Sequence, residues 1–230
     1  MMNNMFFDEQ YKKYGLGAQR RYPNESLIAF LAKYFWNKTE NIKPKILEVG
    51  CGSGANLWMM NKENIDTYGI DSSAAAIDIS KKHVQNKWGG NATVMVGDFS
   101  ALPFKNEFFD AVVDVVSLQH IDKKTSEGVL NEIKRVLKDK GLFFSYRLSD
   151  HSCMYYAEDN EFIDEVTITN INDETLPLSN NGMVSFWSPS FTTYMYKKAG
   201  FRILSMERVL RTYSNGLNNV EYLVITAQKE

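Results

Sequence analysis

A glycine-rich turn between a short apolar run and a helical run constrains the fold more than any other feature of this chain. Residues 45–55 read KILEVGCGSGA, and the apolar residues of 46–49 have the length and composition of a buried strand. Gly50, Gly52 and Gly54 follow at alternate positions, where the lack of a Cβ allows a sharp turn and close approach of a ligand. The helix after the turn directs its unpaired N–H groups into the same crevice, which suits a carboxylate or phosphate. We therefore expect a nucleotide-type site on an α/β fold.

The length and composition are those of one globular domain, with 230 residues, 44% of them hydrophobic. A formal net charge of −2 gives no reason to expect nucleic acid or an anionic membrane as a partner. No stretch approaches the roughly 20 apolar residues of a transmembrane helix, and the first residues do not resemble a secretory signal. Two cysteines, Cys51 and Cys153, are too few for a disulfide framework or a cysteine-based zinc site. We expect a cytoplasmic protein without a bound metal, and make no prediction of its oligomeric state.

Strand-like and helix-like segments alternate between residues 43 and 147. Strands are expected at 45–50, 66–71, 92–98, 109–118 and 142–148, and helices at about 55–64, from Ser72 or Ser73 to about 87, and through 129–137 up to Gly141. An earlier helix is expected after Asn24, which can cap it. This alternation predicts a mostly parallel sheet with helices on both faces.

The alternation breaks after residue 147. Residues 148–189 show no clean period and are interpreted as an insertion over the acceptor pocket, within one domain spanning 1–230. Residues 190–230 are expected to form a closing helix, capped by Ser190 and reaching Ala199, and a terminal hairpin. The hairpin strands, at 201–211 and 219–228, flank the turn signal Asn215-Gly216, so the last strand should enter the sheet antiparallel.

The glycine turn fits two classes of nucleotide site. GxGxG is one reading, and Ala55 also completes the GxGxxA pattern of dinucleotide-binding folds. Asp71, at the end of the second strand, would accept hydrogen bonds from a ribose in either class. Glu48 distinguishes them, because a carboxylate there opposes a pyrophosphate but favours a ligand with an ammonium and a sulfonium. The alternative for Glu48 is an exposed strand-end residue.

The ligand with an ammonium and a sulfonium that Glu48 favours is S-adenosylmethionine, and two further segments agree with it. Asp98 ends the third strand, where it can bond an adenine amino group, and Phe99 can pack on the ring. Strand four runs into Ser117 and His120. Together these motifs, over about 43–147, resemble the class I S-adenosylmethionine-dependent methyltransferases of the small-molecule, methyltransferase-11-like type.

The resemblance implies a Rossmann-like, seven-stranded sheet in the order 3-2-1-4-5-7-6, with the last strand antiparallel. The cofactor-binding residues that it implies are Glu48, Gly50, Gly52, Gly54, Asp71, Ser72, Asp98, Phe99 and Ser117, with Cys51 as a small filler of the loop. The implied activity is methyl transfer from S-adenosylmethionine to a small-molecule acceptor, which yields S-adenosylhomocysteine. An NAD-dependent oxidoreductase and a non-catalytic S-adenosylmethionine-binding module are the alternatives.

Two hypotheses concern the reaction itself. Methyl transfer from a sulfonium depends mainly on proximity and alignment, and His120 is the candidate base for an acceptor that must lose a proton. The alternative is that His120 packs against the adenosine or orients a loop. The N-terminal residues 1–42 are expected to include a lid, in which Tyr14, Arg21 and Tyr22 cover the cofactor and the arginine reaches its carboxylate. A solvated arm is the alternative to the lid.

The insertion has an unusual charge. Residues 148–196 contain eight acidic residues and no lysine or arginine. A lobe of this kind over the acceptor pocket would favour a neutral or cationic metabolite or saccharide and disfavour nucleic acid. Aromatic side chains that could wall such a pocket are Tyr155, Tyr156, Phe186 and Trp187. The alternative is a solvated acidic face with a few core aromatics.

Overall fold

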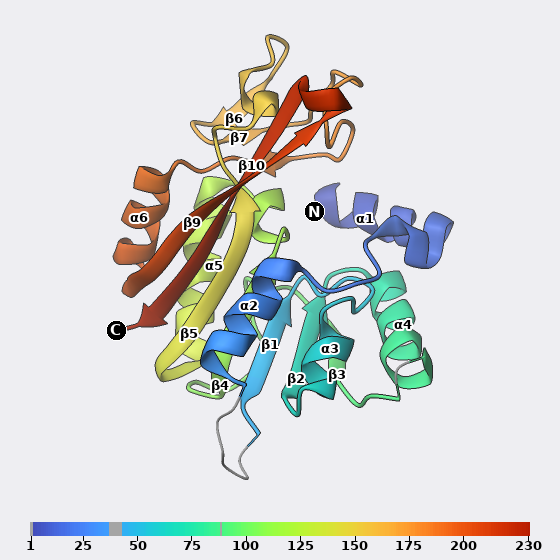
Figure 1. The fold of residues 1–230 in the computed structure, drawn as a ribbon, viewed down its shortest axis with the longest axis vertical. Coiled ribbons are helices and arrows are strands. Elements are labelled where there is room, and N and C mark those ends of the chain that lie inside the picture. Colours follow the sequence, from blue (N-terminus) through green and yellow to red (C-terminus); the bar gives the residue numbers. More distant parts are fainter. Residues whose placement is uncertain (1, 37–42, 88) are drawn as a thin grey trace.

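The computed structural model describes residues 2–36, 43–87 and 89–230, and its centre is a seven-stranded sheet (Figure 1). Its strands are β1 Lys45–Val49, β2 Asp66–Asp71, β3 Thr93–Val96, β4 Phe109–Val115, β5 Leu137–Leu148, β9 Phe201–Tyr213 and β10 Asn218–Lys229. They lie in the order β3-β2-β1-β4-β5-β10-β9, and β10 is antiparallel to both of its neighbours. The predicted strand order, with its antiparallel last strand, is confirmed.

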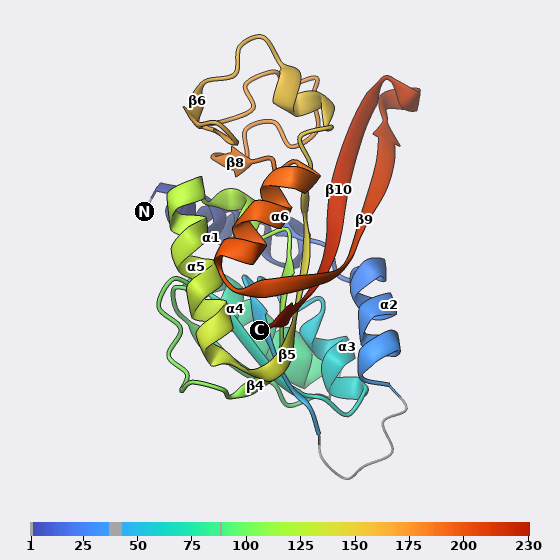
Figure 2. The same cartoon turned by 90° about the vertical axis from the view of Figure 1, so that its left-hand side faces the viewer.

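Helices cover both faces of the sheet (Figure 2). The helices are α2 Glu25–Tyr34, α3 Leu57–Lys62, α4 Ala74–Lys82, α5 Lys123–Val136 and α6 Pro189–Lys198. The buried side chains of α2, α3 and α4 share one hydrophobic cluster, and those of α5 and α6 share another. Strand β1 feeds both clusters, Ile46 on one face and Leu47 on the other, because successive side chains of a strand point to opposite faces. This alternation of side chains along β1 therefore decides which of them is buried beneath the glycine turn.

The ends of the helices agree with the sequence prediction at two places and differ from it at two others. Asn24 caps α2 and Ser73 caps α4, each accepting a backbone N–H with its side-chain oxygen. Helix α6 is capped by Ser188, not Ser190, because Pro189 occupies its first turn, where a missing N–H costs nothing. Helix α5 ends at Val136, before Gly141, because Leu137 already pairs with β4 in the sheet.

Short helical turns complete the central region. They are the π-turn His83–Lys87, which extends α4, and the 3-10 turn Leu118–His120, which follows β4. The hairpin loop between β9 and β10 is the 3-10 turn Ser214–Gly216. Asn215 and Gly216 both have positive φ angles there, 57° and 89°, as the Asn-Gly turn signal requires.

Two segments stand over the edge of the sheet where β1, β2 and β4 end (Figure 1). The first is helix α1, Met2–Tyr14, with the 3-10 turn Gly15–Ala18. The second is residues 149–188, which contain the 3-10 turn Cys153–Tyr156 and a small sheet of β6 Phe162–Asp164, β7 Thr167–Ile168 and β8 Val184–Ser185. The sequence did not predict this small sheet, because two- and three-residue strands are too short to show a period.

Candidate functional site

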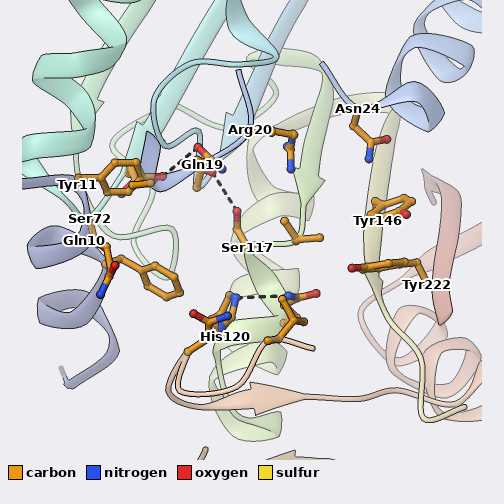
Figure 3. A pocket seen from close by; sticks show the side chains of 18 of the residues that line it. Gln10, Tyr11, Gln19, Arg20, Asn24, Ser72, Ser117, His120, Tyr146 and Tyr222 are labelled. Atoms are coloured by element: carbon orange, nitrogen blue, oxygen red, sulfur yellow. Dashed lines mark hydrogen bonds between the residues drawn. The ribbon is translucent and has the colours of Figure 1, made fainter. Parts of the chain in front are cut away.

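A cavity of about 690 Å³ opens where the central strands end (Figure 3). It is lined by residues of α1, the glycine turn, the ends of β2 and β4, strands β5, β9 and β10, and the insertion. The lining includes Phe7, Tyr11, Gln19, Arg20, Tyr22, Glu25, Gly50, Asp71, Ser72, Phe99, Val116, Ser117, Gln119, His120, Tyr146, Leu178, Asn181, Arg211 and Tyr222. In Figure 3, Tyr11, Gln19 and Ser72 lie at one end and Tyr146 and Tyr222 at the other, with Ser117 between them.

The glycine turn is held by side chains of the neighbouring strands. Gly50 has a φ of 66°, and a Cβ placed on it would lie 2.1 Å from Ser117 Oγ, which donates a hydrogen bond to the Gly50 carbonyl. The Gly52 N–H donates to Asp71 Oδ2 at 2.8 Å, and the other oxygen of Asp71 accepts the Ser73 N–H. Burial raises the pKa of Asp71. Asp71 thus braces the turn and also lines the cavity at the position expected of a ribose acceptor.

Glu48 lies beneath the turn, not on the cavity wall. It is 2% exposed and accepts a hydrogen bond from Asn56 Nδ2, while its Oε2 has no hydrogen-bond partner among the described residues. Burial raises the pKa of Glu48 to about 8, against the opposing effects of the Asn56 hydrogen bond and the positive charge of Arg20. At neutral pH this carboxyl group is therefore mostly protonated.

A buried carboxylate organises the loop after β4. Asp114, which the sequence reading did not single out, accepts the N–H groups of Ser117 and Leu118 at 2.9 and 3.0 Å and the hydroxyl of Ser145 at 2.7 Å. Between them Val116 has a φ of 61°, a left-handed conformation that is an outlier for a β-branched residue. Val116 and Ser117 both line the cavity. The chain is thus held in a strained shape directly at the site.

His120 lines the cavity as a neutral imidazole. Its Nδ1 lies 3.0 Å from the Met183 carbonyl, which requires a proton on Nδ1 and leaves Nε2 as the acceptor. The Gln119 amide nitrogen lies 3.4 Å from Nε2, and the Phe7 ring packs on the imidazole with centroids 4.8 Å apart. Burial lowers the pKa of His120 to about 4. The base hypothesis and the packing hypothesis both remain compatible with this position.

The N-terminal segment docks on the glycine turn. Gln19 Oε1 accepts hydrogen bonds from Tyr11 Oη at 3.0 Å and from the Ser53 N–H at 3.2 Å. Asp8 accepts the Ser73 hydroxyl at 2.7 Å, so α1 is also fixed to the start of α4. These contacts hold α1 and Gln19 across the glycine end of the cavity and close it there.

Residues named for the lid are placed differently from one another. All three are exposed, but Tyr22 lines the cavity, whereas Tyr14 and Arg21 lie outside its lining. Arg20 lines it instead, and its Nε is buried with no hydrogen-bond partner among the residues that the structure describes. Of the two adjacent arginines, Arg20 and not Arg21 lines the cavity.

Three other residues predicted to bind the cofactor, Ser72 and the adenine contacts Asp98 and Phe99, divide in the same way. Phe99 and Ser72 line the cavity. Asp98 is exposed, accepts the Ser100 N–H at 2.8 Å and is not part of the lining. Cys51, predicted as a small filler of the loop, is buried, and a Cβ placed on Gly69 would lie 2.8 Å from Leu57 Cδ1 and 2.9 Å from Cys51 Sγ.

The far end of the cavity is aromatic, but not through the aromatics expected from the insertion. Tyr146 of β5 and Tyr222 of β10 stack with centroids 4.5 Å apart. The insertion contributes Leu178 and Asn181. The four aromatic residues proposed as walls, Tyr155, Tyr156, Phe186 and Trp187, are not part of the lining, and neither are the eight acidic residues of 148–196.

Two of those four aromatics have a structural role. Phe186 and Trp187 are fully buried, and the Arg147 guanidinium lies 3.4 Å from the Trp187 ring centroid. Across residues 2–36, 43–87 and 89–230, histidine, cysteine and acidic side chains form no group of three that could hold a metal. In the same part of the chain, no helix is both long enough and apolar enough to cross a membrane.

Comparison with known families places the glycine turn in a methyltransferase domain. The family model described as a methyltransferase domain matches residues 46–141. A tRNA N(3)-methylcytidine methyltransferase of Schizosaccharomyces pombe, trm141, is 25% identical over 94% of this chain and 91% of its own length. An uncharacterized protein of Methanocaldococcus jannaschii is 34% identical over 43% of this chain, which spans only 34% of that relative.

Solved structures share the fold over most of the chain. A SAM-dependent methyltransferase of Methanosarcina mazei superposes with a TM-score of 0.68 at 21% identity, over 81% of this chain and 92% of that one. The 1,6-didemethyltoxoflavin-N1-methyltransferase of Burkholderia thailandensis, solved with its namesake acceptor and S-adenosylhomocysteine, superposes with a TM-score of 0.70 at 15% identity. That match covers 99% of this chain and 87% of the other.

Proposed function

The chain is a class I S-adenosylmethionine-dependent methyltransferase, and we propose that it transfers the methyl group of this cofactor to a small-molecule acceptor. The observation that carries the proposal is one cavity that joins the glycine turn, Asp71 and Ser117 at one end to a ring-lined space at the other. A cofactor and an acceptor can then share one enclosed volume, which transfer between them requires.

The residues at the glycine end fit this cofactor. We propose that the Gly50–Gly54 turn lies against the methionine part, that Asp71 holds the ribose, and that Phe99 packs on the adenine ring, with Asp98 as the partner of its amino group. Arg20 is the candidate for the cofactor carboxylate, because its buried Nε has no hydrogen-bond partner among the described residues. Glu48, with one unpartnered buried oxygen, is the candidate for the ammonium group.

The chemistry of the cofactor leaves the protein two tasks. The bound cofactor supplies a methyl group already activated on a sulfonium. The chain then has to align the acceptor and, for a hydroxyl or amine, remove a proton. We propose that His120 Nε2 accepts that proton, since Nδ1 is committed to the Met183 carbonyl.

A small acceptor is supported by the enclosure of the cavity. Helix α1 closes the glycine end, and Leu178 and Asn181 of the insertion contribute to the wall of the cavity. The structural relative from Burkholderia thailandensis, which holds 1,6-didemethyltoxoflavin in its structure, superposes over 99% of this chain. The acidic insertion favoured a neutral or cationic acceptor, but its acidic side chains lie outside the lining, so they do not support that preference.

A tRNA acceptor is a second candidate, favoured by one observation. The Schizosaccharomyces pombe relative whose name includes tRNA N(3)-methylcytidine aligns with 94% of this chain. Methyl transfer from labelled S-adenosylmethionine to total tRNA, compared with transfer to a metabolite extract, separates the two candidates.

Calorimetric titration with S-adenosylmethionine, S-adenosylhomocysteine and NADH tests the proposal at its base. We expect heat with the first two ligands and none with NADH. Binding of NADH alone would establish the oxidoreductase alternative. Cofactor binding without transfer to tRNA or to any component of the extract would establish the non-catalytic module.

The lid is tested by truncation. Removal of residues 1–22 should weaken cofactor binding about tenfold, because it removes the Gln19 and Tyr11 contacts over the turn together with Arg20. A separate Arg21→Gln variant should bind normally if Arg20 is the inward residue. Unchanged affinity after truncation would leave the segment a solvated arm.

A further inference from the structure

Two tyrosine rings and an arginine form one continuous surface at the far end of the cavity. Tyr146 and Tyr222 come from neighbouring antiparallel strands and stack at 24°. Arg211 pairs with Val220 on the β9–β10 hairpin, so its side chain and that of Tyr222 leave the same face of that hairpin. All three side chains line the cavity.

The electrostatics place the Arg211 charge beside the two rings. Burial raises the pKa of the Tyr146 and Tyr222 hydroxyls, and the positive charge of Arg211 opposes that rise at both. Two other arginines of the same strand are paired, Arg208 with Glu221 at 2.7 Å and Arg202 with Glu230 at 3.9 Å. Arg211 is exposed, lines the cavity, and has no acidic partner within ion-pair distance among the described residues.

The charge of the remaining wall leaves this cation unbalanced. The other charged lining residues are Arg20, Glu25 and Asp71, and Asp71 already accepts two backbone N–H groups. A bound S-adenosylmethionine adds one net positive charge, since its sulfonium and ammonium outweigh its carboxylate. Glu48, proposed to bind the cofactor ammonium and to lose its proton on doing so, offsets that charge. Arg20 is proposed to bind the cofactor carboxylate, so Arg211 is the lining cation left for an anionic group of the acceptor.

We propose that the acceptor is a flat aromatic small molecule bearing an anionic group, with its ring against Tyr146 and Tyr222 and its anion on Arg211. This inference rests on the proposed function, because it assigns the acceptor half of the same cavity. Aromatic rings stack favourably at this spacing, and a guanidinium binds a carboxylate or phosphate through paired N–H donors. Asn181 of the insertion also lines the cavity and can donate or accept a further hydrogen bond there.

The test is a calorimetric titration of the full chain saturated with S-adenosylhomocysteine. The probes are 4-hydroxybenzoate, its amide and 4-hydroxybenzylamine, which share a ring and differ in charge, together with cytidine 5′-monophosphate as an anion carried on a nucleotide. We expect an anionic probe to bind at least about tenfold more tightly than the amide and the amine. Arg211→Gln should remove this preference, and Arg202→Gln, on the same strand but paired with Glu230, should keep it.

The outcomes separate this inference from the proposed function. S-adenosylhomocysteine is titrated first, and its failure to bind would count against the proposed function. If it binds but the amide or the amine matches the anions, or if no anionic probe binds, the inference is overturned alone. Retention of the preference in Arg211→Gln, or binding of a tRNA stem-loop with no binding of any small probe, would also overturn it.

Discussion

The two ends of the cavity are built from different parts of the polypeptide. At the glycine end, backbone groups dominate. The Gly50 and Gly52 turn, and the N–H groups that Asp71 and Asp114 accept, belong to loops at the ends of neighbouring parallel strands. At the far end, side chains dominate, and Tyr146, Arg211 and Tyr222 all lie beyond the family match of residues 46–141.

This difference separates what the fold provides from what the individual chain provides. A turn fixed by backbone hydrogen bonds and by glycine φ angles admits few substitutions, so it can serve every member of a fold with the same ligand. Side chains projecting from strands and an insertion can change one at a time without altering the sheet. We therefore expect changes at the glycine end to abolish all activity and changes at the far end to alter the choice of acceptor.

The largest effect is expected from Gly50→Ala. The added Cβ would lie 2.1 Å from Ser117 Oγ in a residue with a φ of 66°, so either the turn or the loop after β4 must move. We expect cofactor affinity measured by calorimetry to fall at least about 100-fold, which corresponds to about 3 kcal/mol.

Gly128→Ala is the matched control. A Cβ on Gly128, in the middle of α5, meets no atom within 4 Å, and alanine should stabilise this helix by about 1 kcal/mol with unchanged binding. Normal cofactor binding by Gly50→Ala would show that the glycine end is less constrained than its backbone suggests.

His120 lies between the two ends, and its replacement separates their contributions. His120→Ala should lower kcat about 100-fold and leave cofactor affinity within about threefold. The reason is that Nε2 is proposed to accept the proton of the acceptor, and the imidazole makes no hydrogen bond to the glycine turn among those found. The pKa of His120, lowered by burial to about 4, keeps the imidazole neutral at neutral pH, so activity should fall in acid through this value. Equal losses of kcat and affinity would make His120 a packing residue.

The glycine end could be predicted from the sequence because local residues determine it. Three glycines, a strand before them and an acidic residue at the end of the next strand are all visible in residues 45–71, and Gly50 and Asp71 line one cavity in the structure. The depth of Glu48 could not be predicted. Which face of β1 a residue occupies follows from the packing of α2 and α3, and that packing buries Glu48 beside Asn56.

The far end could not be predicted because long-range pairing creates it. Tyr146 and Tyr222 are 76 positions apart and meet only through the antiparallel pairing of β5 with β10. The break in periodicity after residue 147 predicted an insertion over the acceptor pocket, but its conspicuous aromatics, Phe186 and Trp187, fill the core. Neither tyrosine stands in a recognisable motif, so composition alone favoured the wrong set of rings.

Glu48 allows the glycine end to be probed by pH. Burial raises the pKa of Glu48 to about 8, and the ammonium of a bound cofactor would lower it, so binding should release a proton. Cofactor affinity should then rise as pH increases towards 8, by up to about tenfold per unit. The slope should disappear in Glu48→Gln, which keeps the acceptor for Asn56 Nδ2.

The same shift also affects folding. A carboxyl group whose pKa is raised in the folded state favours folding fully below its unfolded pKa of about 4.5, and this contribution is lost as pH rises through 8. Urea titrations without cofactor should therefore show wild-type stability declining over this window more than that of Glu48→Gln. If the stability of the two proteins changes with pH in the same way, the pKa of Glu48 is not raised by burial.

The smallest effect concerns Val116, where the two ends meet. Its left-handed φ of 61° is held by the Asp114 contacts on one side and by its own N–H, which donates to the Tyr146 carbonyl at 2.8 Å. Val116→Gly loses a half-buried side chain but relieves this strain, so the free energy of unfolding should change by less than about 1 kcal/mol. We expect kcat to fall several-fold, because glycine lets the loop with Ser117 leave the shape that lines the cavity.

Asn64→Gly is the control for strain alone. Asn64 has a φ of 59° on the exposed side of the turn after α3, away from the cavity lining. Its replacement by glycine should also relieve left-handed strain, without any change in kcat. If the two variants change stability and kcat alike, the conformation of Val116 is only a way of ending β4. If only Val116→Gly loses kcat, this strained residue couples the backbone-built end of the cavity to the side-chain-built end.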